Sequence, residues 1–294
     1  MTRGSATLML LTAAFFWGTG NVANKTVLEH IGPLTAVGFR CLIAACVVIP
    51  WAVPEMRTNL GNDWAMSAVL VSLFFCAAMA LQQMAFQTAT VTNASFLVNT
   101  CSILTPIIAW AALRERPHIR IVCAAVITLA GAFLMTGGSF SVAQLNRGDV
   151  LCLLSAIFYA AWMVALGRHI MLYGRPFATS FVQFAISAAI LLPLSATVEV
   201  QSLVRVTNAA PELLGLGLFS TGIAFVLQTR AQQAVSSSTA AIIVSAESLF
   251  GAAGAYLWLG EQTSTMGVCG AVLILSGIMI AAFSTRSVPG LIAR

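Results

Sequence analysis

Residues 81–87 read Leu81-Gln82-Gln83-Met84-Ala85-Phe86-Gln87, and residues 227–233 read Leu227-Gln228-Thr229-Arg230-Ala231-Gln232-Gln233. Leu, Gln, Ala and Gln recur between them at an offset of 146 residues, which also relates Glu115 to Glu261 and Asn99 to Ser245. Residues 10–16 likewise resemble residues 153–159 at an offset of 143. We therefore predict two related halves, residues 1–143 and residues 144–294. In a membrane, such a duplication is typical of a transporter with its site at the interface between the repeats.

The composition requires a lipid environment. The chain is 59% hydrophobic and 8% charged, with a mean hydropathy of +0.94, whereas a soluble domain carries about 25% charged residues. The net charge of +5 comes from scattered single residues and forms no basic stripe, so it does not indicate a nucleic-acid partner. The seven cysteines all lie in apolar stretches without a CxxC pair, and we expect no disulfide, metal or cofactor.

Length and charge breaks predict ten membrane spans, because about 20 mostly apolar residues cross a bilayer. The first span extends to Lys25 and is too long for the apolar core of a signal peptide. No separate soluble domain remains, and the fold class is an all-α integral membrane protein with ten transmembrane helices. The predicted spans are 5–25, 34–53, 64–86, 91–113, 119–137, 148–168, 177–197, 211–230, 236–258 and 265–285.

The distribution of Lys and Arg predicts that both termini are cytoplasmic. Each half has five spans, an odd number, so the second half is inverted relative to the first (5+5), which is the physical basis of alternating access. The hairpin at 87–90 then falls outside and the one at 231–235 inside. The inner set is Arg3, Arg57, Arg114, Arg116, Arg120, Arg168, Arg175, Arg230, Arg286 and Arg294, and the outer set is Lys25, Arg40, Arg147 and Arg205.

Two short acidic segments follow the fourth span of each half: residues 110–116 read Trp-Ala-Ala-Leu-Arg-Glu-Arg, and residues 256–262 read Tyr-Leu-Trp-Leu-Gly-Glu-Gln. The first span carries Phe15-Phe16-Trp17-Gly18-Thr19-Gly20. In these features the chain resembles the EamA branch of the drug/metabolite transporter superfamily, over almost its whole length. Within that branch it is similar to the YddG-type exporters of aromatic amino acids from bacterial inner membranes. It departs from the family where a Glu-Pro or Ser-Pro is common, with Cys101-Ser102 and Glu247-Ser248 instead.

Polar side chains inside spans are costly, and each is a candidate for function. Glu247 is the one acidic residue well inside a predicted span, so it could bind a substrate ammonium group or couple transport to protons. The repeat partners Gln82 and Gln228 could bind a zwitterion, because an amide both donates and accepts hydrogen bonds. The alternative for all of these groups is hydrogen bonding between helices. The candidate cavity residues are Trp17, Asn21, Gln82, Asn99, Tyr159, Trp162, Gln228, Ser245 and Glu247.

The aromatic candidates Trp17, Tyr159 and Trp162 come from spans one and six, which are repeat partners, and could stack on an aromatic substrate. Trp64 and Trp258 at span ends are typical of the interfacial belt. Gly267, Gly270 and Gly277 form a stripe of small residues on the tenth span that favours close helix packing. We expect spans 1, 3, 4, 6, 8 and 9 to line the cavity, with the fifth helix of each half outside.

The leading hypothesis is a secondary transporter in the bacterial inner membrane that exports amino acids, aromatic and other neutral ones, by alternating access. The alternative is an exporter of other neutral metabolites or drugs. A membrane-embedded enzyme would need clustered His, Asp or Glu, and the sequence shows no such cluster and no catalytic motif. The absence of Lys or Arg near the centres of the cavity spans argues against phosphorylated substrates. The expected partners are the bilayer and a small-molecule substrate, and we expect a monomer.

Overall fold

The computed structural model describes residues 1–57, 60–89, 91–137, 146–199, 203–259 and 264–284. Within those ranges the secondary structure is helical and contains no strand. Eight helices in the described part of the chain are long and apolar enough to cross a membrane. Large apolar side chains such as Leu8, Met66 and Phe283 lie exposed on the outer surface. An exposed apolar exterior over a packed interior is the pattern of a bundle surrounded by lipid.

The helices follow the predicted spans closely, and two of the predicted spans consist of two helices each. The first half contains α1 (Arg3–Thr26), η1 (Val27–Glu29), α2 (Pro33–Met56), α3 (Asn62–Ala85), α4 (Val91–Asn99), α5 (Cys101–Leu113) and α6 (Ile119–Met135). The second half contains α7 (Arg147–Tyr173), α8 (Pro176–Val198), α9 (Leu203–Asn208), α10 (Ala210–Gly215), the π-helical η3 (Leu216–Ile223), α11 (Ala224–Ala231), α12 (Ser237–Val244), α13 (Glu247–Leu259) and α14 (Thr265–Ser284). The short helix α9 was not predicted.

Helix breaks occur at matching places in the two halves. The span at 91–113 breaks at Thr100, between α4 and α5, and the span at 236–258 breaks at Ser245 and Ala246, between α12 and α13. The Thr100 hydroxyl donates to the Leu97 carbonyl oxygen, and the Ser245 hydroxyl donates to the Ile242 carbonyl oxygen. Such backward hydrogen bonds compete with the helical pattern and bend helices. The breaks therefore need no proline, although Pro106 lies inside α5.

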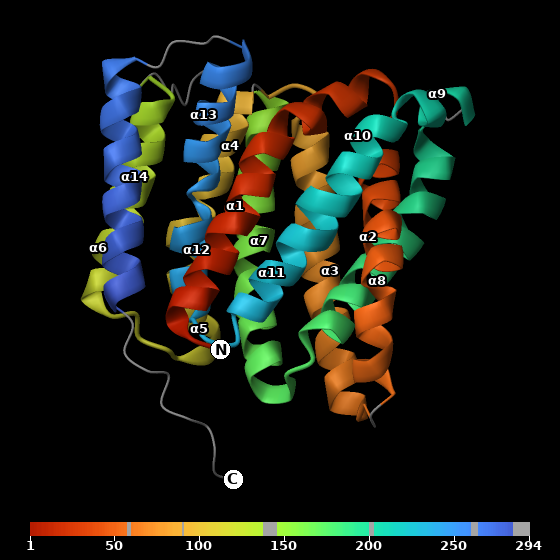
Figure 1. The fold of residues 1–294 in the computed structure, drawn as a ribbon, viewed down its shortest axis with the longest axis horizontal. Helices are drawn as coiled ribbons and strands as arrows, with labels where there is room; N and C mark the ends of the chain where they lie inside the picture. The colour runs from red at the N-terminus through yellow and green to blue at the C-terminus, as the bar shows by residue number, and fades with distance from the viewer. Residues whose placement is uncertain (58–59, 90, 138–145, 200–202, 260–263, 285–294) are drawn as a thin grey trace.

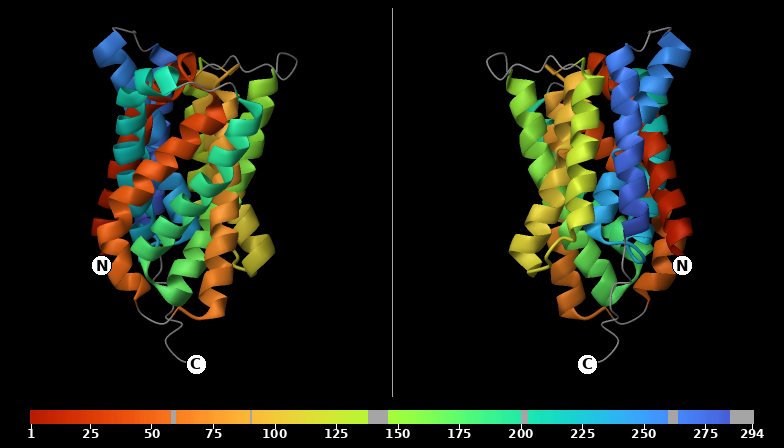
Figure 2. Two further views of the ribbon diagram at one scale, coloured as in Figure 1. Left: turned by 90° about the vertical axis from the view of Figure 1, so that its right-hand side faces the viewer. Right: turned by 90° about the vertical axis from the view of Figure 1, so that its left-hand side faces the viewer.

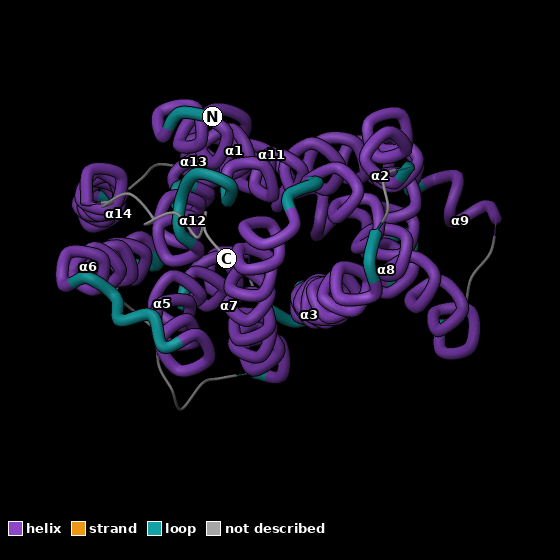
Figure 3. Tube along the Cα trace, turned by 90° about the horizontal axis from the view of Figure 1, so that it is seen from below, coloured by secondary structure: helices purple, strands orange, loops and turns teal. Residues whose placement is uncertain are grey.

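The helices pack as pairs drawn from opposite halves. Helix α6 packs against α14, α2 against α8, α3 against α7, and α1 against α11 and α13. Seen along the bundle, the α6–α14 pair and the α2–α8 pair lie toward opposite ends, with most of the other helices between them and α9 beyond α2 and α8 (Figure 3). Two side views show most helices running along one direction (Figure 2). Helix α1 begins, and α14 ends, in the lower part of the bundle as drawn in Figure 1.

The small residues of α14 permit the α6–α14 contact. A Cβ atom on Gly270 would lie 2.5 Å from the carbonyl oxygen of Gly131 in α6, and a Cβ on Gly131 would lie 2.6 Å from the carbonyl oxygen of Gly270. Only glycine allows two backbones to approach this closely, as the packing role predicted for the stripe requires.

Two carboxylates cap helices of the opposite half. Glu55, near the end of α2, accepts a hydrogen bond of 2.8 Å from the backbone nitrogen of Ala178 in the first turn of α8. Glu199, at the end of α8, accepts from the backbone nitrogens of Leu34 (2.8 Å) and Thr35 (3.0 Å) in the first turn of α2. Neither α2 nor α8 receives a hydrogen bond from its own N-cap side chain. Each helix thus has its free N–H groups satisfied by the carboxylate at its partner's end.

One prediction about an aromatic side chain was wrong. Trp64 does not lie in an interfacial belt, because it is 5% exposed and its ring packs 5.5 Å from that of His169. His169 is buried near the end of α7, where Nδ1 pairs with the Ser67 hydroxyl and Nε2 with the Thr179 hydroxyl. The side chain of Trp258 and the residues of the second acidic segment at 260–262 lie outside the described part of the chain.

Candidate functional site

A cavity lies in the centre of the bundle, where the helices of the two halves meet. It is lined by α1, α2, α3, α4 and α5 of the first half and by α7, η3, α11, α12 and α13 of the second. Neither α6 nor α14 contributes to the wall, as expected for the fifth helix of each half. The prediction omitted α2. The lining residues are Trp17, Asn21, Asn24, Arg40, Met79, Gln82, Val98, Asn99, Cys101, Ser102, Tyr159, Trp162, Met163, Ser220, Phe225, Gln228, Ala241, Val244 and Glu247.

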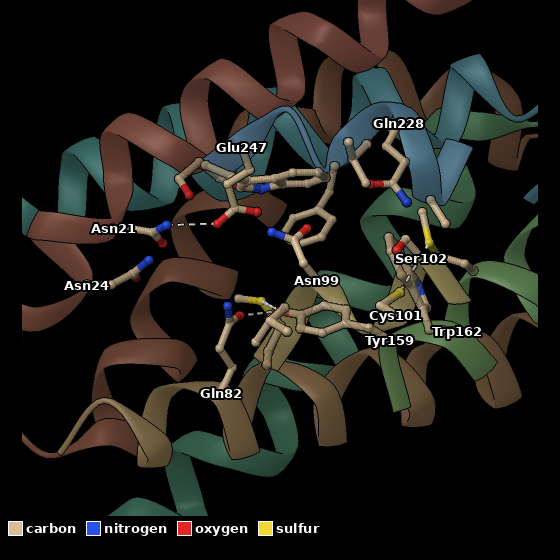
Figure 4. Close-up of a pocket in the computed structure, with 18 of the residues that line it drawn as sticks. Asn21, Asn24, Gln82, Asn99, Cys101, Ser102, Tyr159, Trp162, Gln228 and Glu247 are labelled. Carbon is tan, nitrogen blue, oxygen red and sulfur yellow. Dashed lines mark hydrogen bonds between the residues drawn. The ribbon is translucent and has the colours of Figure 1, made fainter. Parts of the chain in front are cut away.

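Glu247 stands at the first position of α13, directly after the break in the ninth predicted span. One of its carboxylate oxygens accepts a hydrogen bond of 2.8 Å from the Asn21 side chain in α1 (Figure 4). The next residue, Ser248, accepts a hydrogen bond from the Asn99 amide of α4. A carboxylate is favoured at a helix N-terminus, where the helix dipole is positive. The break therefore both exposes Glu247 to the cavity and stabilises its charge.

The close approach of α1 to α13 brings this carboxylate to the cavity. A Cβ on Gly18 would lie 2.5 Å from the backbone oxygen of Glu247 and 2.8 Å from the backbone nitrogen of Gly251. Glycine at position 18 therefore permits a contact that any larger residue would prevent. Asn21, one turn further along α1, is thereby placed within hydrogen-bonding distance of Glu247.

The position of Arg40 differs from the prediction. Arg40 was counted in the outer set of charges that predicts orientation, but it is 4% exposed inside α2 and lines the cavity. Its Nη1 donates to the side-chain oxygens of Asn24 (2.5 Å) and Gln83 (3.3 Å), and its Nε donates to the Thr221 hydroxyl (3.2 Å). The expectation of a cavity without a basic residue is therefore wrong, because α2 was not expected to line the cavity and it contributes one guanidinium group.

Aromatic rings form much of the remaining wall. The Phe225 ring lies 4.8 Å from that of Trp17 and 5.4 Å from that of Trp162, measured between centroids. Trp17 donates through Nε1 to the Ser220 carbonyl oxygen (2.8 Å) in the π-helical segment, and Trp162 donates to the Gln183 side chain (3.1 Å). These hydrogen bonds hold the indole rings in fixed orientations. Such rings can stack on a flat apolar ligand at little cost in conformational entropy.

Other lining side chains carry unused hydrogen-bonding capacity. Both polar atoms of the Gln228 amide, the Ser102 hydroxyl and the Ser220 hydroxyl are buried without a hydrogen-bond partner among the described residues. Gln82, the repeat partner of Gln228, differs because the Gln82 side-chain oxygen accepts a hydrogen bond of 2.7 Å from the Tyr159 hydroxyl. Buried polar groups are nearly always satisfied, so several orphans at one cavity indicate positions where a ligand or water completes the bonding.

The structure brings together eight of the nine candidate residues: Trp17, Asn21, Gln82, Asn99, Tyr159, Trp162, Gln228 and Glu247 all line this cavity. Ser245 does not line it, because its buried hydroxyl is turned back to the Ile242 carbonyl. Gln83, the neighbour of Gln82, does not line the cavity either, and its side chain bonds to Arg40 and to the Asn24 carbonyl oxygen.

Sequence analysis missed several lining residues, among them Arg40, Asn24, Ser102 and Phe225. Asn24 lies one helical turn beyond Asn21, so the helical period could have identified it. Arg40 lies seven residues inside a helix that begins at Pro33, and the N-terminal position of proline could have marked it as internal.

The cavity volume is about 70 Å³, well below the roughly 300–1,000 Å³ of typical small-molecule sites. In this conformation the cavity is contracted, and a ligand of amino-acid size must separate its walls.

Comparisons with known proteins identify the family. The sequence profile of the EamA-like transporter family matches residues 4–137 and again residues 146–283. A protein of Bacillus subtilis (strain 168), named uncharacterized transporter YwfM, is 30% identical over 287 residues, covering 95% of this chain and 94% of that one. An uncharacterized transporter of Archaeoglobus fulgidus is 27% identical over 279 residues, covering 94% and 85%.

A solved structure, described only as the crystal structure of a protein, superposes with a TM-score of 0.77 at 18% identity, covering 97% of this chain and 99% of that one. At this identity the likeness shows a shared fold alone. The two profile matches and the Bacillus relative carry the assignment. This chain therefore belongs to the EamA-like transporter family, within the drug/metabolite transporter superfamily.

Proposed function

We propose that this protein is a secondary transporter that exports amino acids, aromatic and other neutral ones, across the bacterial inner membrane, as the YddG-type exporters do. The observation that carries the proposal is the composition of the central cavity. Its wall combines indole and phenyl rings with neutral amides, one carboxylate and one guanidinium. The rings suit an aromatic side chain, and the balanced charges suit a ligand without net charge.

The sequence argued against phosphorylated substrates because no basic residue was expected in the cavity, and Arg40 contradicts that expectation. The charge balance of the cavity gives a different reason against them. A phosphate group carries about two negative charges and is normally bound by several basic groups. Here the described cavity wall holds one basic group, Arg40, and one acidic group, Glu247, so a phosphorylated ligand would leave negative charge uncompensated in a low-dielectric site.

Alternating access between two inverted halves is the mechanism that we propose. Three observations support it: the family profile matches each half separately, the helices pair between halves, and the two halves break their fourth helix at corresponding positions. The α3–α4 turn lies at the upper end of the bundle and the α11–α12 turn at the lower end (Figure 1). Discontinuous helices at matching positions of two repeats are typical of binding sites in secondary transporters.

The test is uptake of radiolabelled tryptophan by the purified protein in liposomes, with and without a pH gradient. Glutamate and a sugar phosphate serve as control substrates. We expect saturable uptake of tryptophan that exceeds uptake of either control. Folded protein that moves none of the three would overturn the amino-acid assignment. Competition by an unrelated neutral drug, without competition by tryptophan, would favour the alternative function of exporting other neutral metabolites.

Glu247 is the residue through which we expect proton coupling, because its carboxyl group is titratable and faces the cavity. Glutamine has a similar shape and can keep a hydrogen bond with Asn21, but it cannot exchange a proton. Glu247→Gln should abolish the stimulation of tryptophan uptake by a pH gradient, while tryptophan exchange without a gradient persists when tryptophan is saturating. Unchanged gradient dependence in a folded variant would assign the coupling to another group.

A further inference from the structure

Arg40 and Glu247 are opposite charges that line one cavity without neutralising each other. Asn21 bonds to the Glu247 carboxylate and Asn24 bonds to the Arg40 guanidinium, so two neutral amides one turn apart on α1 hold the two charges. Neither charge forms an ion pair within the described part of the chain, and the hydrogen-bond partners of Arg40 are all neutral side chains. Buried charges are normally paired, so both lack the counter-charge that a low-dielectric site demands.

The Arg40 guanidinium and the Glu247 carboxylate each have one atom without a hydrogen bond among the described residues, and these two atoms could bind a ligand. The Nη2 nitrogen of Arg40 has no hydrogen bond to the described residues, and neither does the second carboxylate oxygen of Glu247. Neither atom belongs to the fully enclosed polar atoms without a partner. Both therefore retain access to the cavity, and both keep a strong hydrogen-bonding direction free.

On this basis we propose that Arg40 and Glu247 form a two-point site for a zwitterion, in which Arg40 binds the α-carboxylate and Glu247 binds the α-ammonium group. This inference rests on the proposed function and defines how its substrate is recognised. A zwitterion supplies both missing counter-charges at once and adds no net charge to the cavity. Charge-assisted hydrogen bonds of this kind are about twice as strong as neutral ones.

The layout of the cavity places the substrate side chain as well. Asn21 and Asn24, which hold the two charges, lie at one end of the cavity, whereas Trp162, Ser102 and Gln228 lie at the other end (Figure 4). An amino acid with its charged end between Arg40 and Glu247 therefore directs its side chain toward Trp162 and Gln228. A ligand that lacks either charge would leave one buried protein charge without compensation.

The test measures binding of four indole ligands to the purified full-length protein in detergent micelles. Tryptophan has both charges, tryptamine lacks the carboxylate, 3-indolepropionate lacks the ammonium group, and indole lacks both. With the wild-type protein we expect tryptamine and 3-indolepropionate each to bind about 10- to 100-fold more weakly than tryptophan, as expected for the loss of a charge-assisted bond. This series needs no substitution, so it stands even if a variant does not fold.

Two variants test which charge of the ligand Arg40 binds and which Glu247 binds. Arg40→Gln should weaken tryptophan and 3-indolepropionate about 10- to 100-fold and leave tryptamine within about 2-fold, whereas Glu247→Gln should weaken tryptophan and tryptamine but not 3-indolepropionate. Gln83→Leu is the matched control, because it removes a hydrogen-bond partner of Arg40 without removing the charge. Any effect of Gln83→Leu should be equal for all four ligands.

The failures are distinguishable. Absence of saturable tryptophan binding to the folded wild-type protein would overturn both the proposed function and the zwitterion site. Equal binding of tryptophan, tryptamine and 3-indolepropionate would leave the function standing and overturn the two-point site. An Arg40→Gln variant that weakens every ligand by one factor would make Arg40 a structural residue and would also overturn it.

Discussion

Gln228 is a buried amide, 1% exposed, at the end of the cavity where Trp162 lies. Neither of its polar side-chain atoms has a hydrogen bond to the described residues. An orphaned amide of this kind destabilises the fold, and its retention is explained if it serves a ligand. The indole N–H group of tryptophan is a donor that phenylalanine lacks. Gln228 can therefore distinguish the two substrates by accepting that hydrogen bond.

We expect Gln228→Leu to bind tryptophan about 3- to 10-fold more weakly, the value of one hydrogen bond, and to bind phenylalanine within about 2-fold of wild type. The same variant should melt at an equal or higher temperature, since it removes an unsatisfied buried group. Binding assays and thermal unfolding monitored by tryptophan fluorescence check both points. A lower melting temperature with unchanged tryptophan affinity would show that the amide is structural.

At the scale of residues, the sequence identified polar side chains that line the cavity but did not place Arg40 among them. Glu247, Asn21 and Asn99 could be selected because a polar group inside an apolar span is conspicuous. Arg40 lies only seven residues into its span, a distance at which a long basic side chain usually reaches the interface. The local sequence does not show that Asn24, Gln83 and Thr221, from three other helices, supply hydrogen bonds that keep it inside.

At the scale of elements, the two reciprocal caps connect the ends of α2 and α8. Each helix begins with a proline at the first turn, which fixes the backbone but leaves other N–H groups free. Glu199 satisfies those of α2, with three hydrogen bonds when the Thr35 hydroxyl is included, and Glu55 satisfies Ala178 in α8. The capping residues contribute no side chain to the cavity wall.

We expect Glu199→Gln to destabilise the protein by about 1–2 kcal/mol and Glu55→Gln by about 0.5–1 kcal/mol, because a neutral amide is a weaker acceptor and loses the helix-dipole interaction. Each variant should lower the melting temperature in detergent and leave the tryptophan dissociation constant unchanged. Thermal unfolding with parallel binding assays makes the comparison. If both substitutions leave the melting temperature unchanged, the observed hydrogen bonds contribute nothing measurable to stability.

Helix breaks mark the limit of sequence reasoning at this scale. The approximate boundaries of the spans could be predicted, because length and hydropathy determine what crosses a bilayer. The breaks at Thr100 and Ser245 could not, since an apolar segment with hydroxyl residues reads as one continuous helix. Even the π-helical segment Leu216–Ile223 has no sequence signal beyond its glycines. These irregular points supply Glu247 and Ser220 to the cavity, so the parts least visible in the sequence position much of the site.

At the scale of the whole molecule, the contracted cavity requires that helices separate for a substrate to enter. Helix α7 meets α12 tightly near the lower end of the bundle, where a Cβ on Gly167 would lie 3.6 Å from the Cβ of Ser237. Close by, the Gln232 side chain donates to the Met163 carbonyl oxygen of α7. In alternating access one end of the cavity opens while the other stays closed, so contacts like these must break once in every cycle.

A disulfide tests whether this contact moves. Separations between Cβ atoms of about 3.5–4.5 Å suit a disulfide, so Gly167→Cys combined with Ser237→Cys should cross-link under oxidation. We expect the cross-link to abolish tryptophan transport and a reductant to restore it, since the bond holds the lower ends of α7 and α12 together. Each single-cysteine variant controls for the native cysteines, which are free in the structure. Full transport by the cross-linked protein would show that α7 and α12 move as one unit and that the opening lies elsewhere in the bundle.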